Sequence, residues 1–289
     1  MFSKTKEKEK LILTFDLEIW HESKWMEPFI SEDLKKDTLT ESVLPLLHIL
    51  KETNSHATFF TTNAVLDNYP EIIKKIFSED HEVGSHSTTH IRLDEQQAEV
   101  FEGNLQLQKE KIEKLIGKNV SGFRAPHFSL NQKTKWLIPL LTRLGFLYDS
   151  SIFPIKTPEY GISKAPTFPY KISSETLLEE KGSSFLEFPQ STVKIFGLQI
   201  PVAGGVYFRI LPLFIFKFLL NMAIKQGNTP MVYFHPHELY SETPRIKGPI
   251  LKTFIKYFGT KRSLLKFNKL IKNYTCISVE EYISKVKNV

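Results

Sequence analysis

The sequence is almost free of cysteine and contains no long apolar run. Cys276 is the only cysteine among 289 residues, which excludes an internal disulfide and a metal site built on thiolates. No apolar stretch reaches the roughly 18–20 residues that a membrane-spanning helix needs. The N-terminal segment is rich in Lys and Glu, and the apolar run behind it is too short for a signal peptide. We therefore expect a cytoplasmic protein.

Acidic side chains become scarce towards the C-terminus. From Arg245 onward, eleven Lys and Arg residues stand against two Glu residues, whereas the net charge of the whole chain is only +6. Such a region suits nucleic acid, an anionic membrane surface or a phosphate-bearing substrate, and it also suits an ordinary solvated helix face. We favour the solvated face and expect no nucleic-acid partner.

Short strand-like segments alternate with helix-like segments, which is typical of an α/β fold with parallel strands. We expect strands at 11–15, 57–61, 81–84, 122–123, 146–148, 185–188, 231–234 and 275–278. We expect helices at 40–52, 64–77 (divided at Pro70), 94–116 (capped by Asp94 and ended by Gly117), 134–144, 211–225, within 248–272, and after 278. About eight short strands with helices between them predict a TIM-like (β/α) barrel, in which functional side chains lie at the C-terminal ends of strands.

The length of the chain suits one large domain, which we expect to span residues 1–289. From about 150 to 205 the helical periods give way to Pro, Ser, Gly and short aromatic runs, which predicts a loop-rich insertion. A basic helical region follows at about 245–289. Phe is frequent, with 23 residues, which indicates an aromatic-rich core or a partly apolar surface.

Candidate functional residues follow the strand-like runs. Asp16 and Glu18 come at the end of the first strand, two residues apart and therefore on one side of it. His86 and His90 follow the third strand, and two imidazoles with one carboxylate form the ligand set of a catalytic zinc with an open position. Each pair taken alone is as easily a set of solvated or structural side chains.

Three further polar positions extend this pattern. Arg124 precedes Ala125-Pro126 and is suited to orient a carboxylate through paired hydrogen bonds. His127 faces the site through its side chain or its backbone N–H. His235 ends the apolar run MVYF, where an imidazole is placed for proton transfer, although His237 and Glu238 compete for that role.

The ordered segments TFDLE, HEVGSHSTTH, FRAPHF, YDSSIFP and VYFHPHE resemble the polysaccharide deacetylases, carbohydrate esterase family 4. The resemblance runs from about Leu11 to Glu238. The segment EFPQSTVKIFGLQIPVAGGVYFRILP resembles the subgroup associated with bacterial exopolysaccharide and surface-glycan biosynthesis. The resemblance to the family implies a distorted seven- or eight-stranded barrel that binds a divalent metal, usually zinc. It also implies a hydrolase of carbon–nitrogen bonds other than peptide bonds, which removes N-acetyl groups from amino sugars.

Carried over by position, the resemblance implies a role for each of the following residues: Asp16 as catalytic base, Arg124 as the residue that orients it, His235 as general acid, His86 and His90 as metal ligands, and His127 and Asp149 as substrate or oxyanion residues. The commonest form of the family has two adjacent aspartates. Here Leu17 separates Asp16 from Glu18, and the resemblance to relatives with spaced acids implies that Glu18 is the carboxylate ligand.

Other functions remain open at this point. One alternative is a hydrolase of a non-sugar linear or cyclic amide, similar to allantoinases, and another is a non-catalytic glycan-binding barrel. The apolar segment RILPLFIFKFLLNMAIK and the basic C-terminal region suit peripheral binding to the inner membrane and a lipid-linked glycan substrate. They suit a buried barrel helix and an ordinary basic surface better.

Overall fold

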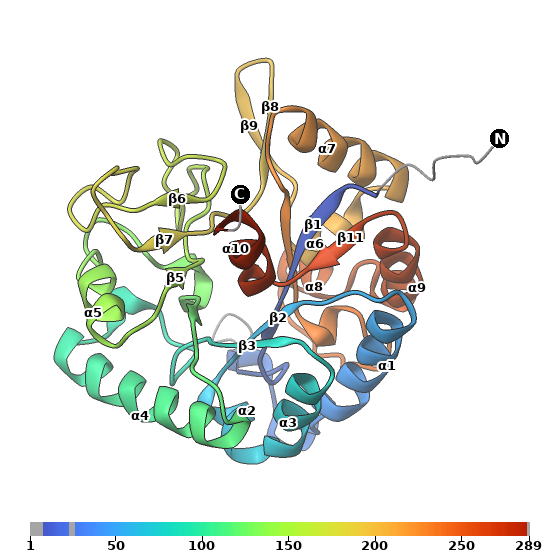
Figure 1. The fold of residues 1–289 in the computed structure, drawn as a ribbon. Helices are drawn as coiled ribbons and strands as arrows, with labels where there is room; N and C mark the ends of the chain where they lie inside the picture. The colour runs from blue at the N-terminus through green and yellow to red at the C-terminus, as the bar shows by residue number, and fades with distance from the viewer. Residues whose placement is uncertain (1–7, 23–26, 288–289) are drawn as a thin grey trace.

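The computed structural model describes residues 8–22 and 27–287 and shows an α/β fold around one curled main sheet (Figure 1). Parallel strands lie in the order β10, β1, β2, β3, β4, β5 and β7, with β6 antiparallel at the end and β11 paired with the start of β1. Among the described residues no pairing joins β10 to β6 or β7, so the barrel has one open seam. The main-sheet strands are β1 (Lys10–Leu17), β2 (Thr58–Thr61), β3 (Glu82–Ser85), β4 (Gly122–Phe123), β5 (Tyr148–Asp149), β6 (Tyr170–Lys171), β7 (Leu186–Glu187), β10 (Met231–Phe234) and β11 (Thr275–Ile277).

Most helices cover the outer side of the sheet, whereas the C-terminal helix lies across the centre of the ring of strands (Figure 1). The α-helices are α1 (Leu39–Glu52), α2 (Asn63–Asn68), α3 (Pro70–Ser78), α4 (Ala98–Ile116), α5 (Leu137–Arg143), α6 (Gly205–Ile210), α7 (Leu213–Lys225), α8 (Ile250–Tyr257), α9 (Thr260–Ile271) and α10 (Val279–Lys287). The short 3₁₀ segments are η1 (Glu27–Phe29), η2 (Glu32–Leu34), η3 (Leu93–Glu95), η4 (Pro126–Phe128) and η5 (Pro236–Glu238).

Strand β1 is buried on both faces, which explains its nearly continuous apolar sequence. Leu13 and Phe15 belong to the large core between the sheet and the helices. Ile12 belongs to a separate apolar cluster inside the barrel. Because successive side chains of a strand alternate between its faces, Thr14 and Asp16 lie on the inner side with Ile12. The strand thus carries a carboxylate into the barrel mouth at its C-terminal end.

The core is aromatic-rich, as the frequency of Phe predicted. Phe15 and Phe59 stack with ring centres 4.8 Å apart, and Phe234 packs edge-on against Phe267 with ring centres 5.4 Å apart. Offset and edge-on ring pairs contribute roughly 0.5–1.5 kcal/mol each beyond the apolar area that they bury. Phe15 also contacts Phe234, with ring centres 6.1 Å apart, so these aromatic contacts link β1, β2, β10 and α9.

Several predicted boundaries agree with the structure, whereas the predicted cap of the helix at 94–116 is wrong. The helical pattern of 64–77 divides at Pro70, which begins α3, and Gly117 ends α4 in the left-handed conformation with φ 71°. Asp94 does not cap α4, which begins four residues later at Ala98. Asp94 instead lies in η3, where its carboxylate accepts hydrogen bonds from Arg92 Nε at 3.0 Å and Nη2 at 3.1 Å.

The region from 150 to 205 contributes to the main sheet as well as forming loops. Its strand β7 pairs in parallel with β5, and β6 pairs antiparallel with β7. The hairpin of β8 (Thr192–Ile195) and β9 (Leu198–Pro201) was not predicted. Its turn contains Phe196 and Gly197, both with positive φ, and Gly197 is the one local sign of such a turn.

The predicted helix at 211–225 begins only at Leu213, because Leu211 and Pro212 separate it from α6. The basic region is divided into α8 and α9 at Gly259, which has φ 78°. Within the part of the chain that the structure describes, no helix combines the length and apolar character needed to cross a bilayer. Cys276 is buried on β11, and burial raises the pKa of its thiol to about 12.

Candidate active site

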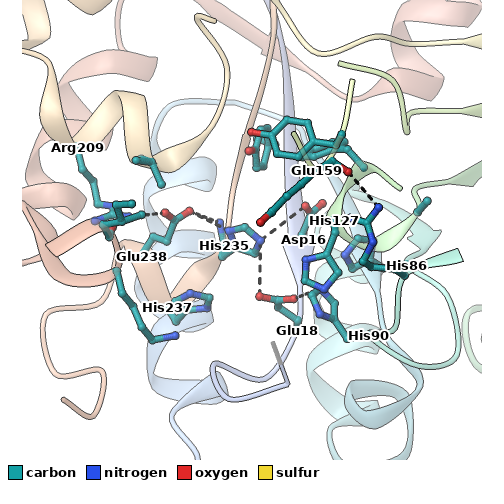
Figure 2. A pocket seen from close by; sticks show the side chains of 18 of the residues that line it. Asp16, Glu18, His86, His90, His127, Glu159, Arg209, His235, His237 and Glu238 are labelled. Carbon is teal, nitrogen blue, oxygen red and sulfur yellow. Dashed lines mark hydrogen bonds and ion pairs between the residues drawn. The ribbon is translucent and has the colours of Figure 1, made fainter. Parts of the chain in front are cut away.

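A cavity of about 720 Å³ lies at the C-terminal ends of the parallel strands, where barrel folds hold their functional groups (Figure 2). The sequence-predicted residues that line it are Asp16, Glu18, His86, His90, His127 and His235. They come from the end of β1, the segment after β3, the η4 turn and the residue after β10. Residues more than 200 positions apart are therefore brought into one hollow because parallel strands end at one edge of a sheet.

Asp16 and Arg124 form a fully buried ion pair at the base of the cavity. Arg124 Nη1 donates to Asp16 Oδ1 at 2.7 Å and to Thr14 Oγ1 at 2.9 Å. The same guanidinium donates to the carbonyl and the hydroxyl of Ser150 and lies 4.3 Å from the ring centre of Phe60. Burial raises the pKa of Asp16, but the Arg124 charge outweighs it and lowers the pKa below its usual value. Asp16 is therefore an ionised carboxylate held in one orientation.

Glu18, His86 and His90 form a buried set of potential metal ligands. One ligand atom from each lies within 4.8 Å of the others. Glu18 Oε2 lies 2.6 Å from His90 Nε2, so the carboxylate and this imidazole are in direct contact. His86 Nδ1 donates to the carbonyl of Arg124 at 2.9 Å, so its Nε2 carries the lone pair. Burial lowers the pKa of His86 to about 4, which keeps its imidazole neutral. The donor set fits a divalent cation.

His235 lies on the opposite side of Glu18 from His86 and His90 (Figure 2). Its Nε2 is 3.6 Å from Glu18 Oε1 and 3.8 Å from Asp16 Oδ2. Its Nδ1 donates to Glu238 Oε2 at 2.9 Å. Burial lowers the pKa of His235, but the surrounding carboxylates, Glu18 first and then Glu238, raise it to about 9. Glu238 thus holds Nδ1 of the ring, and Nε2 faces the cavity.

His127 lies in the cavity wall, whereas Asp149 does not reach the cavity. The ring centre of His127 is 4.5 Å from that of His90, and its backbone has φ 57°, a left-handed conformation that is uncommon outside glycine. Asp149 is buried behind the site, where its Oδ1 accepts a hydrogen bond from Ser151. Nδ1 of His235 contacts Glu238 and not Asp149. The Ser151 hydroxyl in turn accepts a hydrogen bond from the N–H of Ala125.

A second set of potential ligands, Glu18, His235 and His237, shares Glu18 with the first. Burial and the ammonium group of Lys256 together lower the pKa of His237 to about 3. The same ammonium group repels a cation placed beside His237. The set with His86 and His90 is therefore the better cation site.

The sequence did not identify Arg209, which comes from α6 and also lines the cavity. Its Nη2 donates to Glu238 Oε1 at 2.8 Å, and both side chains are buried. Glu238 had been only a competitor for the role of His235. An arginine within an apolar run such as GGVYFRILP carries no local sign that it meets a carboxylate from a later loop.

Asp149 and Glu187 form an unusual buried pair of acids on neighbouring strands. They are register partners of β5 and β7, and neither is exposed. Burial raises the pKa of Asp149 to about 6 and, together with the Asp149 carboxylate, raises that of Glu187 well above its usual value. Two neighbouring buried negative charges repel each other, which favours a state in which this pair of carboxyl groups retains a proton.

Comparison with known families divides the chain near residue 150. Residues 3–146 match the family model of polysaccharide deacetylase, and residues 150–284 match a domain of unknown function, DUF3473. A peptidoglycan deacetylase from Helicobacter pylori is 27% identical over 150 residues, which cover 50% of this chain and 50% of that protein. The chain spans half or less of the length of the curated relatives it matches.

Solved structures share the fold. A polysaccharide deacetylase homologue from Mycobacterium smegmatis superposes with a TM-score of 0.62 at 19% identity, covering 100% of this chain and 93% of the other. The allantoinase Puue superposes with a TM-score of 0.57 at 14% identity, covering 96% and 88%. These likenesses confirm the predicted α/β barrel, and they do not distinguish a sugar substrate from a cyclic amide.

The shared proton of Asp149 and Glu187 predicts how stability depends on pH. Above about pH 4.3 the unfolded chain releases a proton that the folded pair retains, so the free energy of unfolding falls with rising pH, by at most about 1.4 kcal/mol per pH unit for each proton retained. Glu187→Gln removes the shared proton, and we expect a flatter dependence and higher stability than wild type at alkaline pH. Urea unfolding across pH measures this.

Glu71→Gln, at an exposed position of α3, is the matched control for that experiment and should keep the wild-type pH dependence. Equal slopes for wild type and Glu187→Gln would show that the pair holds no extra proton in the folded state.

Proposed function

We propose that this chain, whose residues 3–146 match the polysaccharide deacetylase family, is a metal-dependent hydrolase that removes the acetyl group from an N-acetylated amino sugar. The match of residues 3–146 to the polysaccharide deacetylase model supports the predicted family and its hydrolase chemistry. The observation that carries the proposal is the single cavity that holds a cation ligand set, an oriented carboxylate and an imidazole held by a second carboxylate. Together these groups can supply the metal, the base and the acid of metal-assisted amide hydrolysis.

Glu18, His86 and His90 would hold the cation. When bound, a divalent cation lowers the pKa of a water molecule towards about 7 and polarises the acetyl carbonyl. Zinc is the proposed metal, since two imidazoles and a carboxylate with an open position match its catalytic sites. The same ligands also suit other first-row metals, so metal analysis of the purified protein tests this choice, and we expect it to find zinc.

The remaining residues move protons. As the water oxygen bonds to the acetyl carbon, Asp16 accepts the proton that the water loses, and Arg124 keeps that carboxylate aimed at the cavity. The carbon–nitrogen bond then breaks, and Nε2 of His235 gives its proton to the departing nitrogen. Acetate and a free amine are the products. Protonation by His235 is needed because an amide nitrogen leaves poorly as an anion.

His127 is the proposed oxyanion residue. Its left-handed backbone places a turn directly beside His90, and its N–H is proposed to donate to the oxygen that becomes negatively charged. A single donor of this kind typically contributes about 2.7–4 kcal/mol of transition-state stabilisation. Backbone strain of about 1–3 kcal/mol at one residue is commonly retained at such sites.

The proposed substrate is a bacterial surface glycan or exopolysaccharide, or a precursor of one. The decisive experiment is release of acetate from N-acetylated oligosaccharides by the metal-loaded protein, measured beside hydrolysis of allantoin. We expect acetate release and no allantoin turnover. Turnover of allantoin alone would favour the cyclic-amide alternative, and a metal-loaded protein inert on both substrate classes would favour a non-catalytic barrel.

Substitutions in the cavity should separate metal binding from proton transfer. We expect His86→Ala to lose bound zinc, because one of three ligands is removed. We expect Asp16→Asn and His235→Ala to retain zinc and to lose deacetylation by roughly 10²–10⁴-fold, the usual contribution of a general base or acid. Metal content and acetate release are measured on the same samples, with the exposed His48→Ala as control. Full zinc content in His86→Ala would contradict the ligand assignment.

The cavity rim also carries a surface suited to a membrane. Helix α8 exposes Ile250, Leu251 and Phe254 by 90%, 70% and 46%, and we call these three residues the α8 face. The same helix contributes Ile255 and Lys256 to the cavity lining. An exposed apolar helix face commonly marks an interaction site.

Charge indicates which partner suits the α8 face. Exposed Lys247, Lys261 and Arg262 flank it in the sequence, within the basic C-terminal region. Each basic residue near an anionic bilayer contributes about 1 kcal/mol of attraction. We propose that the α8 face docks on the cytoplasmic leaflet of the inner membrane, which would bring the cavity to a lipid-linked glycan. Docking by an apolar face with basic flanks is typical of peripheral proteins.

Vesicle sedimentation tests the α8 face. We expect wild-type protein to bind vesicles that contain phosphatidylglycerol and not pure phosphatidylcholine, with binding lost in the double variant Ile250→Asp/Leu251→Asp. The control, Val100→Asp/Leu107→Asp, changes two residues of α4 with exposures of 59% and 61% and should bind normally. Absence of vesicle binding by wild type at low salt, or self-association through α8 in its place, would contradict the docking proposal.

A further inference from the structure

Arg209 joins three elements beside the cavity. Its Nη2 donates to Glu238 Oε1 at 2.8 Å and to the carbonyl of Ile255 at 2.9 Å, while its Nη1 donates to the carbonyl of Phe258 at 2.6 Å. The guanidinium therefore binds η5 and the C-terminal carbonyls of α8 from its own position in α6. Its exposed fraction is 5%, so solvent does not compete for these bonds.

Glu238 passes this restraint on to His235. Its Oε2 accepts hydrogen bonds from both the backbone N–H of His235 at 3.1 Å and the ring Nδ1–H at 2.9 Å. Two bonds to one oxygen fix the position of the ring and the tautomer together. A proton held at Nδ1 by a carboxylate leaves Nε2 as the atom that faces Asp16 and Glu18.

We infer that Arg209 and Glu238 are positioning residues for the acid step, and that residues 150–284, matched only to a domain of unknown function, supply them. The inference rests on the proposed function of His235 as general acid. Arg209 acts by keeping Glu238 ionised and in place, because a buried carboxylate without a cation either takes up a proton or turns towards water. Loss of that carboxylate frees the ring of His235.

Gly205 provides an independent sign that the carboxylate position matters. A Cβ atom at Gly205 would lie 2.1 Å from Glu238 Oε2, far inside van der Waals contact. The backbone of α6 thus passes directly against the carboxylate that binds His235. A side chain at this position would push Glu238 away from the imidazole without changing any charge.

Two buried ion pairs of the same kind lie at this site. Arg124 holds the carboxylate of Asp16, and Arg209 holds that of Glu238. The first arginine belongs to the region matched to the deacetylase family and the second to the region of unknown function. The first pair orients the proposed base, and the second orients the proposed acid.

The test compares two leaving groups in Arg209→Gln and Gly205→Ala. An N-acetylated sugar needs a proton on the leaving nitrogen, whereas 4-nitrophenyl acetate releases a stable anion and needs none. We expect kcat on the amide to fall by roughly 10²-fold in both variants, with ester hydrolysis and zinc content within about threefold of wild type. Arg209→Lys should recover part of the amide activity, because it restores a cation without the guanidinium fork.

Matched controls separate positioning from general damage. Gly103→Ala adds a methyl group in α4 where nothing lies within 4 Å, and Arg143→Gln removes a surface arginine paired with Glu102. Both should leave amide and ester activity unchanged. Equal losses of amide and ester hydrolysis in Arg209→Gln and Gly205→Ala would overturn the inference, because a structural defect does not distinguish leaving groups.

NMR of the ring protons keeps the inference testable without a substrate. We expect the zinc-loaded wild type to show a protected, downfield Nδ1–H signal for His235, assigned by its absence in His235→Gln. The signal should vanish or move upfield in Arg209→Gln and in Gly205→Ala. An unchanged signal in both folded variants would overturn the positioning role, whereas a wild type with this signal but no deacetylation would contradict only the proposed function.

Discussion

The buried ion pair of Asp16 and Arg124 is the interaction on which the rest of the site depends. The guanidinium of Arg124 binds Asp16, Thr14 and Ser150. The backbone carbonyl of Arg124 accepts a hydrogen bond from Nδ1–H of His86. One residue thus orients the proposed base and one proposed metal ligand at once. Removal of either partner would leave an uncompensated buried charge, which typically costs about 3–5 kcal/mol. A substitution of either residue should therefore lower the stability of the fold as well as disturb the site.

The sequence predicts much of the fold and most of the cavity, because both depend on local pattern and chain order. The apolar run of β1 and the break at Pro70 are visible in the sequence, and both occur in the structure. The polar residues after successive strands were expected to meet, and Asp16, His86 and His235 line one cavity. Parallel strands make that convergence predictable, since their C-terminal ends share one edge.

What the sequence does not reveal depends on contacts between distant segments. Arg209 meets Glu238 only because α6 packs against η5, and nothing near either residue specifies that approach. Asp94 does not cap α4 because the helix begins only at Ala98, and the sequence pattern does not show that Asp94 binds Arg92 instead. Asp149 follows a strand like the other candidates, yet it is paired with Glu187 from a strand that adds to the sheet beyond it. The residue pattern alone does not show whether the side chain of Asp149 faces the cavity.

The single thiol of the chain has a practical consequence. Cys276 is buried on β11 with its pKa raised to about 12, so at neutral pH it is almost wholly protonated, and the thiolate that reacts with oxidants and alkylating reagents is scarce. The described fold therefore offers no competing reactive sulfur. A cysteine introduced at any exposed position becomes the one attachment point for a spin label or fluorophore, and distances or insertion depths can be measured without first removing a native residue.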